Sequence, residues 1–266
     1  MFSYMILIPK YIKGGELMLT EERYAAILRL LTEKKAVTVT ELTRLLNTSE
    51  STVRRDLTSL HKSGRLYKVY GGATAIDNRY SASEEDMRTK SSLFTEEKVG
   101  IARLAAGLVK RRDFVYLDAG STTLQMIDFL TEKGATYVTN GLPHASKLSS
   151  RGFKVFILGG AMKATTEAVV GSGAIRSLEA YNFTKGFFGT NGISTQSGYS
   201  TPDADEGEVK GEALKRCKHA YVLADRSKFN RIAPITFGSI SSATIITGKL
   251  EDKKYRDFTT VLEDGE

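Results

Sequence analysis

The stretch from Ser49 to Ala73 constrains the fold of this 266-residue chain more than any other. Ser49 is a hydroxyl residue of the kind that caps a helix, and the apolar residues after it are spaced four and three apart, at Val53, Leu57 and Leu60. This spacing predicts a short helix with one buried face. The opposite face would be exposed and would carry hydroxyls and two adjacent arginines: Ser51, Thr52, Arg54 and Arg55.

The residues on both sides of this helix predict a winged helix-turn-helix. Upstream, an apolar period predicts a helix from Glu22 to Leu31, a β-branched run covers 37–39, and Thr40 is expected to cap a second helix. Downstream, the sequence predicts a β-hairpin that turns at Ser63-Gly64. The exposed face of the Ser49 helix is then suited to phosphates and base edges of DNA. The alternative is a generic small helical domain with a few surface arginines.

Charge is unevenly distributed along the chain, whose formal net charge is +7. Residues 1–76 hold 12 Lys and Arg against 7 Asp and Glu, whereas residues 77–266 hold 26 against 24. Most of the excess therefore lies in the part that is predicted to bind DNA.

One cysteine, Cys217, excludes an intramolecular disulfide and fits a reducing cytoplasm. With three unclustered histidines, we expect no metal site and no cofactor. No apolar run reaches the length of about 18 residues that spans a membrane. Residues 1–17 are predicted to be a misannotated extension before Met18, because Lys13-Gly14-Gly15-Glu16 is what a translated ribosome-binding site would encode; a genuine flexible tail is the alternative.

The remainder is predicted to be a linker at 77–95 and an α/β domain at 96–266, after a DNA-binding domain at 18–76. Short apolar runs alternate with helical patterns, which is typical of a mostly parallel sheet. The predicted strands are Phe114–Leu117, Thr136–Val138, Val155–Leu158, Gly186–Phe188, Ala220–Leu223 and Thr244–Ile246. After a helix beginning at Glu96, the predicted helices are Thr123–Glu132, Pro143–Ser149, Ala174–Glu179 and Glu206–Cys217.

Small polar residues follow four of these strands, where α/β sheets bind ligands. They are Gly120-Ser121-Thr122-Thr123, Thr139-Asn140-Gly141, Gly159-Gly160 and Gly189-Thr190-Asn191-Gly192. The first group opens a helix and predicts a phosphate site without the lysine of a Walker A loop. Each group alone has a simpler explanation, because Gly-Ser-Thr-Thr also caps ordinary helices, Gly-Gly and Asn-Gly form turns, and Glu206 with Lys210 fits a surface ion pair.

Thr52-Val-Arg-Arg-Asp-Leu and Gly71-Gly72-Ala73 resemble the N-terminal domain of the DeoR family of bacterial transcription regulators. Leu117-Asp-Ala-Gly-Ser-Thr-Thr, Val138-Thr-Asn, Leu158-Gly-Gly and Leu223-Ala-Asp-Arg-Ser-Lys-Phe resemble the effector domain of the same family, over about residues 96–250. That resemblance implies a fold similar to ribose-5-phosphate isomerase and glucosamine-6-phosphate deaminase.

The resemblance also implies roles for individual residues. The DNA contacts would come from Ser49, Ser51, Thr52, Arg54, Arg55 and Lys68. The effector pocket would be formed at or near Asp118, Gly120, Ser121, Thr122, Thr123, Asn140, Gly159, Gly160, Asn191, Glu206, Lys210, Asp225 and Lys228. Segments such as Phe188-Gly-Thr-Asn-Gly and His219-Ala-Tyr-Val-Leu-Ala-Asp are most similar to fructose operon repressors, which respond to fructose 1-phosphate.

Two functions follow from these patterns. The first is a cytoplasmic repressor that binds double-stranded operator DNA as a homo-oligomer, a dimer or tetramer, and is released by a sugar phosphate. The second is a sugar-phosphate isomerase or deaminase with an appended DNA-binding domain. The related enzymes use acidic residues in the loop that corresponds to 189–192, where this chain has Thr190 and Asn191, which cannot act as a general base near pH 7. The first function is therefore favoured, with no catalytic residues.

Overall fold

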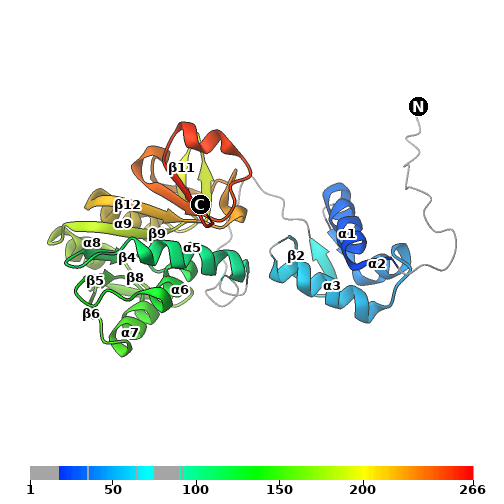
Figure 1. The fold of residues 1–266 in the computed structure, drawn as a ribbon, viewed down its shortest axis with the longest axis horizontal. Helices are drawn as coiled ribbons and strands as arrows, with labels where there is room; N and C mark the ends of the chain where they lie inside the picture. Colours follow the sequence, from blue (N-terminus) through cyan, green and yellow to red (C-terminus); the bar gives the residue numbers. More distant parts are fainter. Residues whose placement is uncertain (1–17, 35, 64, 75–89, 91–92, 266) are drawn as a thin grey trace. The chain divides into compact units, whose positions relative to one another are not determined.

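The computed structural model describes residues 18–34, 36–63, 65–74, 90 and 93–265, and the chain divides into two compact units, Met1–Asp77 and Asn78–Glu266 (Figure 1). The predicted extension at 1–17, Gly64 of the predicted hairpin turn, and most of the predicted linker at 77–95 lie outside the described residues. Each unit has its own apolar core, so each is described by itself.

The first unit is a winged helix-turn-helix, as the sequence predicts. Its elements are α1 (Thr20–Lys34), β1 (Ala36–Thr38), α2 (Val39–Leu45), α3 (Glu50–Lys62), β2 (Tyr67–Val69) and β3 (Gly72–Thr74). The strands form an antiparallel sheet in the order β1-β3-β2. Ile27 from α1, Leu42 from α2 and Leu57 from α3 are fully buried together. The apolar period of each helix therefore faces one shared core.

The prediction that Thr40 caps the second helix is wrong by two residues. α2 begins at Val39, and the hydroxyl of Thr38 accepts a hydrogen bond from the backbone N–H of Glu41 at 3.1 Å. Thr38 is also the last residue of β1, opposite Gly72 of β3. Strand pairing holds its backbone extended, and an extended residue is what a helix cap requires.

The prediction that the hairpin turns at Ser63-Gly64 is also wrong. Ser63 ends α3, with its N–H bonded to the carbonyl of Ser59 at 3.0 Å. The hairpin of β2 and β3 turns at Tyr70 and Gly71, and Gly71 has a φ of +83°, which favours glycine. A Cβ at Gly72 would lie 2.1 Å from the carbonyl oxygen of Val37 in β1. The paired glycines are thus needed for the turn and for close packing against β1.

The second unit is built on a parallel sheet of seven strands in the order β15-β14-β12-β9-β4-β5-β6. They span β4 (Phe114–Leu117), β5 (Thr136–Thr139), β6 (Lys154–Ile157), β9 (Phe183–Gly189), β12 (Cys217–Leu223), β14 (Thr244–Thr247) and β15 (Val261–Glu263). The helices are α5 (Thr95–Gly107), α6 (Ser121–Phe129), α7 (Leu142–Ser150), α8 (Ser172–Glu179) and α9 (Ala204–Lys215), with 3-10 turns η1 (Arg226–Lys228), η2 (Ile240–Ser242) and η3 (Lys253–Asp257). The predicted α/β class is confirmed.

All six predicted strands and all the predicted helices are present, with ends shifted by up to three residues. Six strands of this unit had no sequence prediction: β7 (Ala161–Lys163), β8 (Ala168–Val170), β10 (Gly192–Ser194), β11 (Gly198–Thr201), β13 (Ile235–Gly238) and β15. β7 pairs with β8, while β10, β11 and β13 form a small antiparallel sheet. Most are only three or four residues long, too short to show a clear alternation of their own.

Helices cover both faces of the large sheet (Figure 1). Val115 and Leu117 of β4 pack with Met126 of α6 in one core, to which α5 and α7 also contribute. Tyr116 points the other way and packs in a second core with Ala174 of α8 and with α9. Both faces of the central strands are therefore buried, which explains why β4 is a continuous apolar run.

The strand order reverses between β4 and β9. From β4 the chain first adds β5 and β6 on one side, and then returns to add β9, β12, β14 and β15 on the other. In doubly wound sheets such a reversal leaves a crevice outside the carboxyl ends of the two strands, because their following loops run in opposite directions. Those loops begin at Asp118 and Thr190.

A buried ion pair joins α1 to α3 in the first unit, and we expect its loss to destabilise that unit. Arg23 donates two hydrogen bonds to Asp56, at 2.7 and 3.1 Å, and the Asp56 side chain is 4% exposed. Arg23→Met leaves a buried carboxylate without its counter-charge and should cost about 2–3 kcal/mol of local stability. Native-state amide hydrogen exchange of α3 measures this loss. Arg29→Met, at an exposed position of α1, is the matched control, and equal exchange in both variants would contradict the expectation.

Candidate functional site

The exposed face of α3 carries the residues that the sequence assigned to DNA contacts. Ser49 caps the helix, accepting from the N–H of Thr52 at 3.2 Å, and its hydroxyl lies 2.8 Å from that of Ser51. Arg54 and Arg55 are exposed, and Arg54 pairs with Glu50 one turn earlier at 3.3 Å. An exposed pair of this kind is weak, so Arg54 can exchange Glu50 for a phosphate at little cost.

The hairpin adds two side chains to this surface. Lys68 of β2 is exposed and donates to the hydroxyl of Thr58 on α3 at 2.7 Å, which places it beside the helix. Tyr70 at the turn is fully exposed, with a relative accessibility of 108%. Tyr70 was not among the residues predicted to contact DNA.

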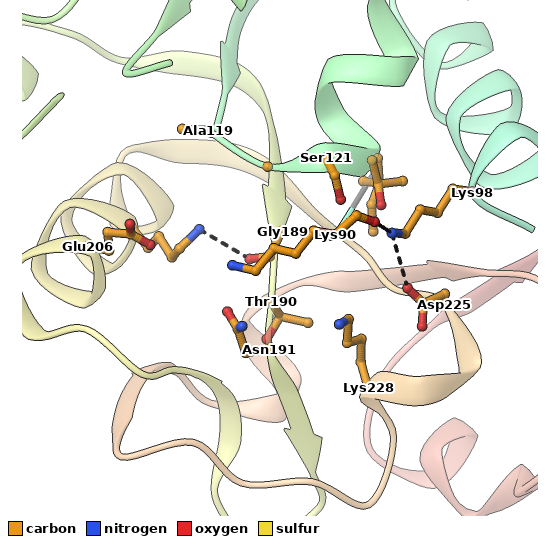
Figure 2. Close-up of a pocket in the computed structure, with 14 residues that line it drawn as sticks. Lys90, Lys98, Ala119, Ser121, Gly189, Thr190, Asn191, Glu206, Asp225 and Lys228 are labelled. Carbon is orange, nitrogen blue, oxygen red and sulfur yellow. Dashed lines mark hydrogen bonds and ion pairs between the residues drawn. The ribbon is translucent and has the colours of Figure 1, made fainter. Parts of the chain in front are cut away.

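A cavity of the second unit opens at the crevice between β4 and β9 (Figure 2). It encloses about 510 Å³ of space between atoms, counting the part that is open to solvent. Eight of the predicted effector residues line it, from the loops after β4, β9 and β12 and from α9: Gly120, Ser121, Thr122, Asn191, Glu206, Lys210, Asp225 and Lys228.

Three other predicted residues support the first loop from behind instead of lining the cavity. Asn140 accepts the backbone N–H of Ala119 at 2.9 Å. The hydroxyl of Thr123 accepts the N–H of Gly120 at 3.1 Å and donates to the carbonyl of Asp118 at 2.6 Å. Asp118 itself accepts the N–H of Gly189 at 2.9 Å and pairs with Lys210. These bonds set the shape of the loop that opens α6.

Gly159 and Gly160 lie away from this cavity. They form the turn after β6 and approach α8 closely, where a Cβ on Gly160 would lie 2.7 Å from the carbonyl of Val170 and 3.0 Å from the amide of Ala174. Their position at a strand end is as predicted, but β6 is the outer strand of the sheet and its carboxyl end is distant from the strand-order reversal. We therefore assign these glycines to packing.

The amino terminus of α6 points into the cavity. Ser121 and Thr122 are its first residues, both at least 90% buried, and the first-turn N–H groups of a helix have no acceptor within the helix. A Cβ at Gly120 would lie 3.2 Å from the Thr123 hydroxyl, which is a tight contact, and 3.6 Å from Gly189, which is an ordinary one. Free N–H groups, two hydroxyls and the positive end of the helix dipole form an anion site.

Four lysines surround this anion site: Lys90, Lys98, Lys210 and Lys228. Lys210 and Lys228 were predicted from the sequence, whereas Lys90 and Lys98 were not. Lys98 is only 3% exposed, on α5, with its Nζ 4.0 Å from a carboxylate oxygen of Asp225. One feature of the sequence could have indicated Lys98, because it stands among apolar residues of the predicted helix. A lysine buried there would require a partner.

Two carboxylates face the same cavity, Glu206 and Asp225. Burial acts to raise the pKa of Glu206, but Lys210, the hydroxyl of Thr166 and Lys163 outweigh it, so its pKa is lowered and the group is charged at neutral pH. Asp225 caps η1, accepting the N–H of Ser227 at 2.9 Å. Charged carboxylates beside an anion site are suited to accept hydrogen bonds from hydroxyl groups of a ligand that also carries a phosphate.

The loop after β9 contributes Thr190 and Asn191. Thr190 donates its hydroxyl to the carbonyl of Gly192 at 2.9 Å, and the side-chain oxygen of Asn191 accepts from Thr201 at 3.4 Å. Neither residue has an ionisable group, as the sequence showed. Within the described part of the chain, no group of three or more His, Cys, Asp or Glu side chains is placed to hold a metal ion.

One histidine behind the loop was not predicted from sequence. His144 of α7 is 1% exposed, and its Nε2 lies 3.1 Å from both the carbonyl of Gly120 and the hydroxyl of Thr123. Burial lowers the pKa of His144 to about 3, so its ring is neutral at pH 7. A neutral ring can donate one proton to the Gly120 carbonyl, which holds the loop in place.

His144 should make stability depend on pH in a known direction. In the unfolded chain a histidine has a pKa near 6.5, so below about pH 6.5 the unfolded state binds a proton that the folded state does not. Stability should therefore fall as pH drops from about 6.5, by about 1.4 kcal/mol per pH unit from this group. His144→Gln should remove this slope in urea unfolding followed by circular dichroism, whereas His219→Gln, at an exposed position, should keep it. An unchanged slope in the first variant would contradict this role.

No helix in the described parts of the chain is long and apolar enough to cross a membrane. Two family models match the chain. The DeoR-like helix-turn-helix domain covers residues 23–79, and the DeoR C-terminal sensor domain covers residues 93–249. The two matches coincide with the units that carry α3 and the lysine-lined cavity.

Several curated relatives extend over nearly the whole chain. The uncharacterized HTH-type transcriptional regulator FruR of Bacillus subtilis is 43% identical over 91% of this chain and 96% of its own length. The lactose phosphotransferase system repressor of Streptococcus mutans is 33% identical over 92% of this chain and 99% of its own. The HTH-type transcriptional regulator IolR of Bacillus subtilis is 31% identical over 84% and 88%.

Among solved structures, ribose 5-phosphate isomerase A from Neisseria gonorrhoeae is similar over 54% of this chain and 55% of that chain, with 15% identity and a TM-score of 0.38. The matching relatives are named as transcriptional regulators and repressors, not as enzymes, so the hypothesis of an isomerase or deaminase is set aside. The chain belongs to the DeoR family of transcriptional regulators.

Proposed function

We propose that this regulator is a cytoplasmic repressor of a sugar-utilisation operon, and that a sugar phosphate releases it from operator DNA. The observation that carries this proposal is the cavity itself: a helix amino terminus and four lysines face two charged carboxylates. The first set fits a phosphate dianion, and the second fits the hydroxyl groups of a sugar.

Fructose 1-phosphate is the effector that we propose. Its support is the relation to the regulator named FruR, at 43% identity, together with the sequence segments that resemble fructose operon repressors. The sugar-specific contacts would come from Asn191, Glu206 and Asp225, which line the same cavity. Other sugar phosphates are the alternatives that the experiment below includes.

We further propose that the regulator binds DNA as a dimer or tetramer. A helix-turn-helix reads one half-site, and two copies are needed for the two half-sites of an operator. The effector would change how the two DNA-binding units of an oligomer match the half-site spacing. Coupling of this kind is typically worth about 1–3 kcal/mol, or roughly 5- to 150-fold in DNA affinity.

The proposal that the exposed face of α3 contacts operator DNA is tested by Arg54→Ala and Arg55→Ala. Loss of a bidentate base contact should weaken operator binding by about 1–3 kcal/mol, and loss of a phosphate contact should lower the salt slope by about one. Fluorescence anisotropy at several salt concentrations measures both quantities. Lys253→Ala, at an exposed position of η3, is the control. Unchanged operator affinity in both arginine variants would refute the proposal that α3 contacts the operator.

The effector site is tested by Thr122→Glu. A carboxylate at the amino terminus of α6 would repel a phosphate in a site that is 6% exposed at Thr122, so the release of DNA by fructose 1-phosphate should be abolished. Operator binding without effector should persist, because the substitution lies in the other unit. Thr236→Glu, at an exposed threonine of β13, should respond normally.

The titration includes fructose 6-phosphate and fructose 1,6-bisphosphate beside fructose 1-phosphate. If another sugar phosphate releases the DNA, the fructose 1-phosphate assignment fails and the effector site stands. If Thr122→Glu still releases DNA at the wild-type concentration of effector, the assignment of the phosphate to α6 fails.

A further inference from the structure

Glu206 is one of two carboxylates that line the effector cavity, and its orientation decides what it can accept from a ligand (Figure 2). It belongs to the first turn of α9, where its backbone N–H donates to the side chain of Asp203 at 2.9 Å. Two contacts to its carboxylate come from the hairpin of β7 and β8. No described residue of this hairpin lines the cavity, so these contacts reach Glu206 from behind.

Thr166 makes the shorter of the two contacts. Its hydroxyl donates to Oε1 of Glu206 at 2.5 Å, and Nζ of Lys163 lies 3.3 Å from the same oxygen. A hydroxyl that donates to a charged carboxylate over this distance forms one of the stronger hydrogen bonds in proteins. Thr166 is 2% exposed and Glu206 is 6% exposed, so bulk water competes little for this bond.

The two contacts do not exhaust the acceptor capacity of Glu206. A carboxylate has about four acceptor sites, so Glu206 can be held through Oε1 and still accept hydrogen bonds from a ligand. The bond from Thr166 then fixes how the carboxylate is turned, and with it the direction in which the remaining acceptor sites point into the cavity.

The hairpin that carries Thr166 is fixed to the rest of the α/β unit. β8 is buried along its length and packs in the same apolar core as α9. The carbonyl of Glu167, the next residue, accepts the N–H of Leu142 at 3.0 Å. The N–H of Val169 donates to the carbonyl of Asn140 at 2.6 Å. The place of the Thr166 hydroxyl is therefore set by the packing of the hairpin.

The donors of the anion site come from different residues. They are the first-turn N–H groups of α6 and the hydroxyls of Ser121 and Thr122. The hydroxyl of Thr166 is bonded to Glu206 of α9, and its removal leaves the donors of α6 in place. A change at Thr166 should thus affect the recognition of ligand hydroxyls more than the recognition of phosphate.

We propose that Thr166 is a positioning residue for recognition of the sugar: its hydroxyl holds Glu206 in the orientation that accepts a hydroxyl group of the ligand. Thr166 itself does not touch the ligand. This inference deepens the proposed function and rests on it, because it takes the ligand to be a sugar phosphate. It adds that the hairpin of β7 and β8, behind the cavity, contributes to the choice of sugar.

The experiment measures the affinities of the full chain for fructose 1-phosphate and for inorganic phosphate by calorimetry. Thr166→Val and Thr166→Ala each remove the hydroxyl, so one serves if the other does not fold, and Thr166→Ser keeps it. Thr165→Val is the matched control, because Thr165 is the preceding residue of the same loop and is exposed. Inorganic phosphate probes the anion site alone, so the ratio of the two affinities reports the contribution of the sugar.

We expect Thr166→Val and Thr166→Ala to bind fructose 1-phosphate about tenfold more weakly, because Glu206 loses the charge-assisted hydrogen bond that directs it. Their affinity for inorganic phosphate should match that of the wild type. Thr166→Ser should restore the affinity for fructose 1-phosphate, and Thr165→Val should match the wild type for both ligands. A purely structural role would weaken the binding of both ligands together.

A double-mutant cycle tests whether Thr166 acts through Glu206. Glu206→Ala should weaken the binding of fructose 1-phosphate, and adding Thr166→Val to it should have little further effect, because the group that Thr166 positions is already gone. If the two substitutions instead reduce the affinity independently, so that their effects multiply, Thr166 does not act through Glu206 and the inference is wrong.

An unchanged ratio of affinities in the variants without the hydroxyl, or an equal loss for both ligands, overturns the positioning role and leaves the proposed function intact. If fructose 1-phosphate does not release the wild type from the operator, the measurements use whichever of fructose 6-phosphate and fructose 1,6-bisphosphate does. If none of the three releases the DNA, the proposed function fails in the wild type itself, and this inference fails with it.

Discussion

The buried contact between Asp118 and Lys210 is the interaction on which the effector cavity depends. Asp118 follows β4, Lys210 belongs to α9, and one carboxylate oxygen of Asp118 accepts both the Lys210 ammonium and the N–H of Gly189 after β9. The two loops that diverge at the strand-order reversal are thereby joined to each other and to a helix. Neither side chain is more than 6% exposed. Because the loss of either partner would leave a buried charge uncompensated, the three elements are held in one arrangement.

The anion site follows from this arrangement. With the loop after β4 held by Asp118, Asn140 and Thr123, the amino terminus of α6 is directed into the cavity. Preorganised donors bind an anion without the cost of ordering a loop. The neutral ring of His144 supports the same loop through the carbonyl of Gly120.

The two units differ in how their positive charges are placed. The exposed face of α3 carries adjacent arginines over a core built from three helices, so its surface can change without affecting its fold. The cavity instead pairs its cations with carboxylates inside the α/β body. Residues 77–266 as a whole have almost balanced charge although four lysines line the cavity. Net charge identifies the DNA-binding unit but not the anion site of the sensor unit.

Local patterns were sufficient for the elements that carry their own signal. The apolar run Phe114–Leu117 is β4, the cap at Ser49 begins α3 as expected, and Ser121 with Thr122 follows its strand into the cavity. The hairpin turn was misplaced because Ser63-Gly64 and Tyr70-Gly71 are both local turn signals. The tertiary structure decides between them, because α3 continues to Lys62 and Val69 of β2 pairs with Gly72 of β3.

What the sequence determined by itself is the order and type of the main helices and strands, since apolar periodicity is a property of neighbouring residues. What only the tertiary structure decided is which of the polar strand ends share a site. Gly159-Gly160 and Gly120-Ser121 both follow strands, but β6 is at the edge of the sheet and β4 is at the reversal of strand order. Lys98 comes from a segment with no motif, and it reaches the cavity because packing brings α5 beside β12 and the loop after it. Distance along the chain carries no information about such contacts.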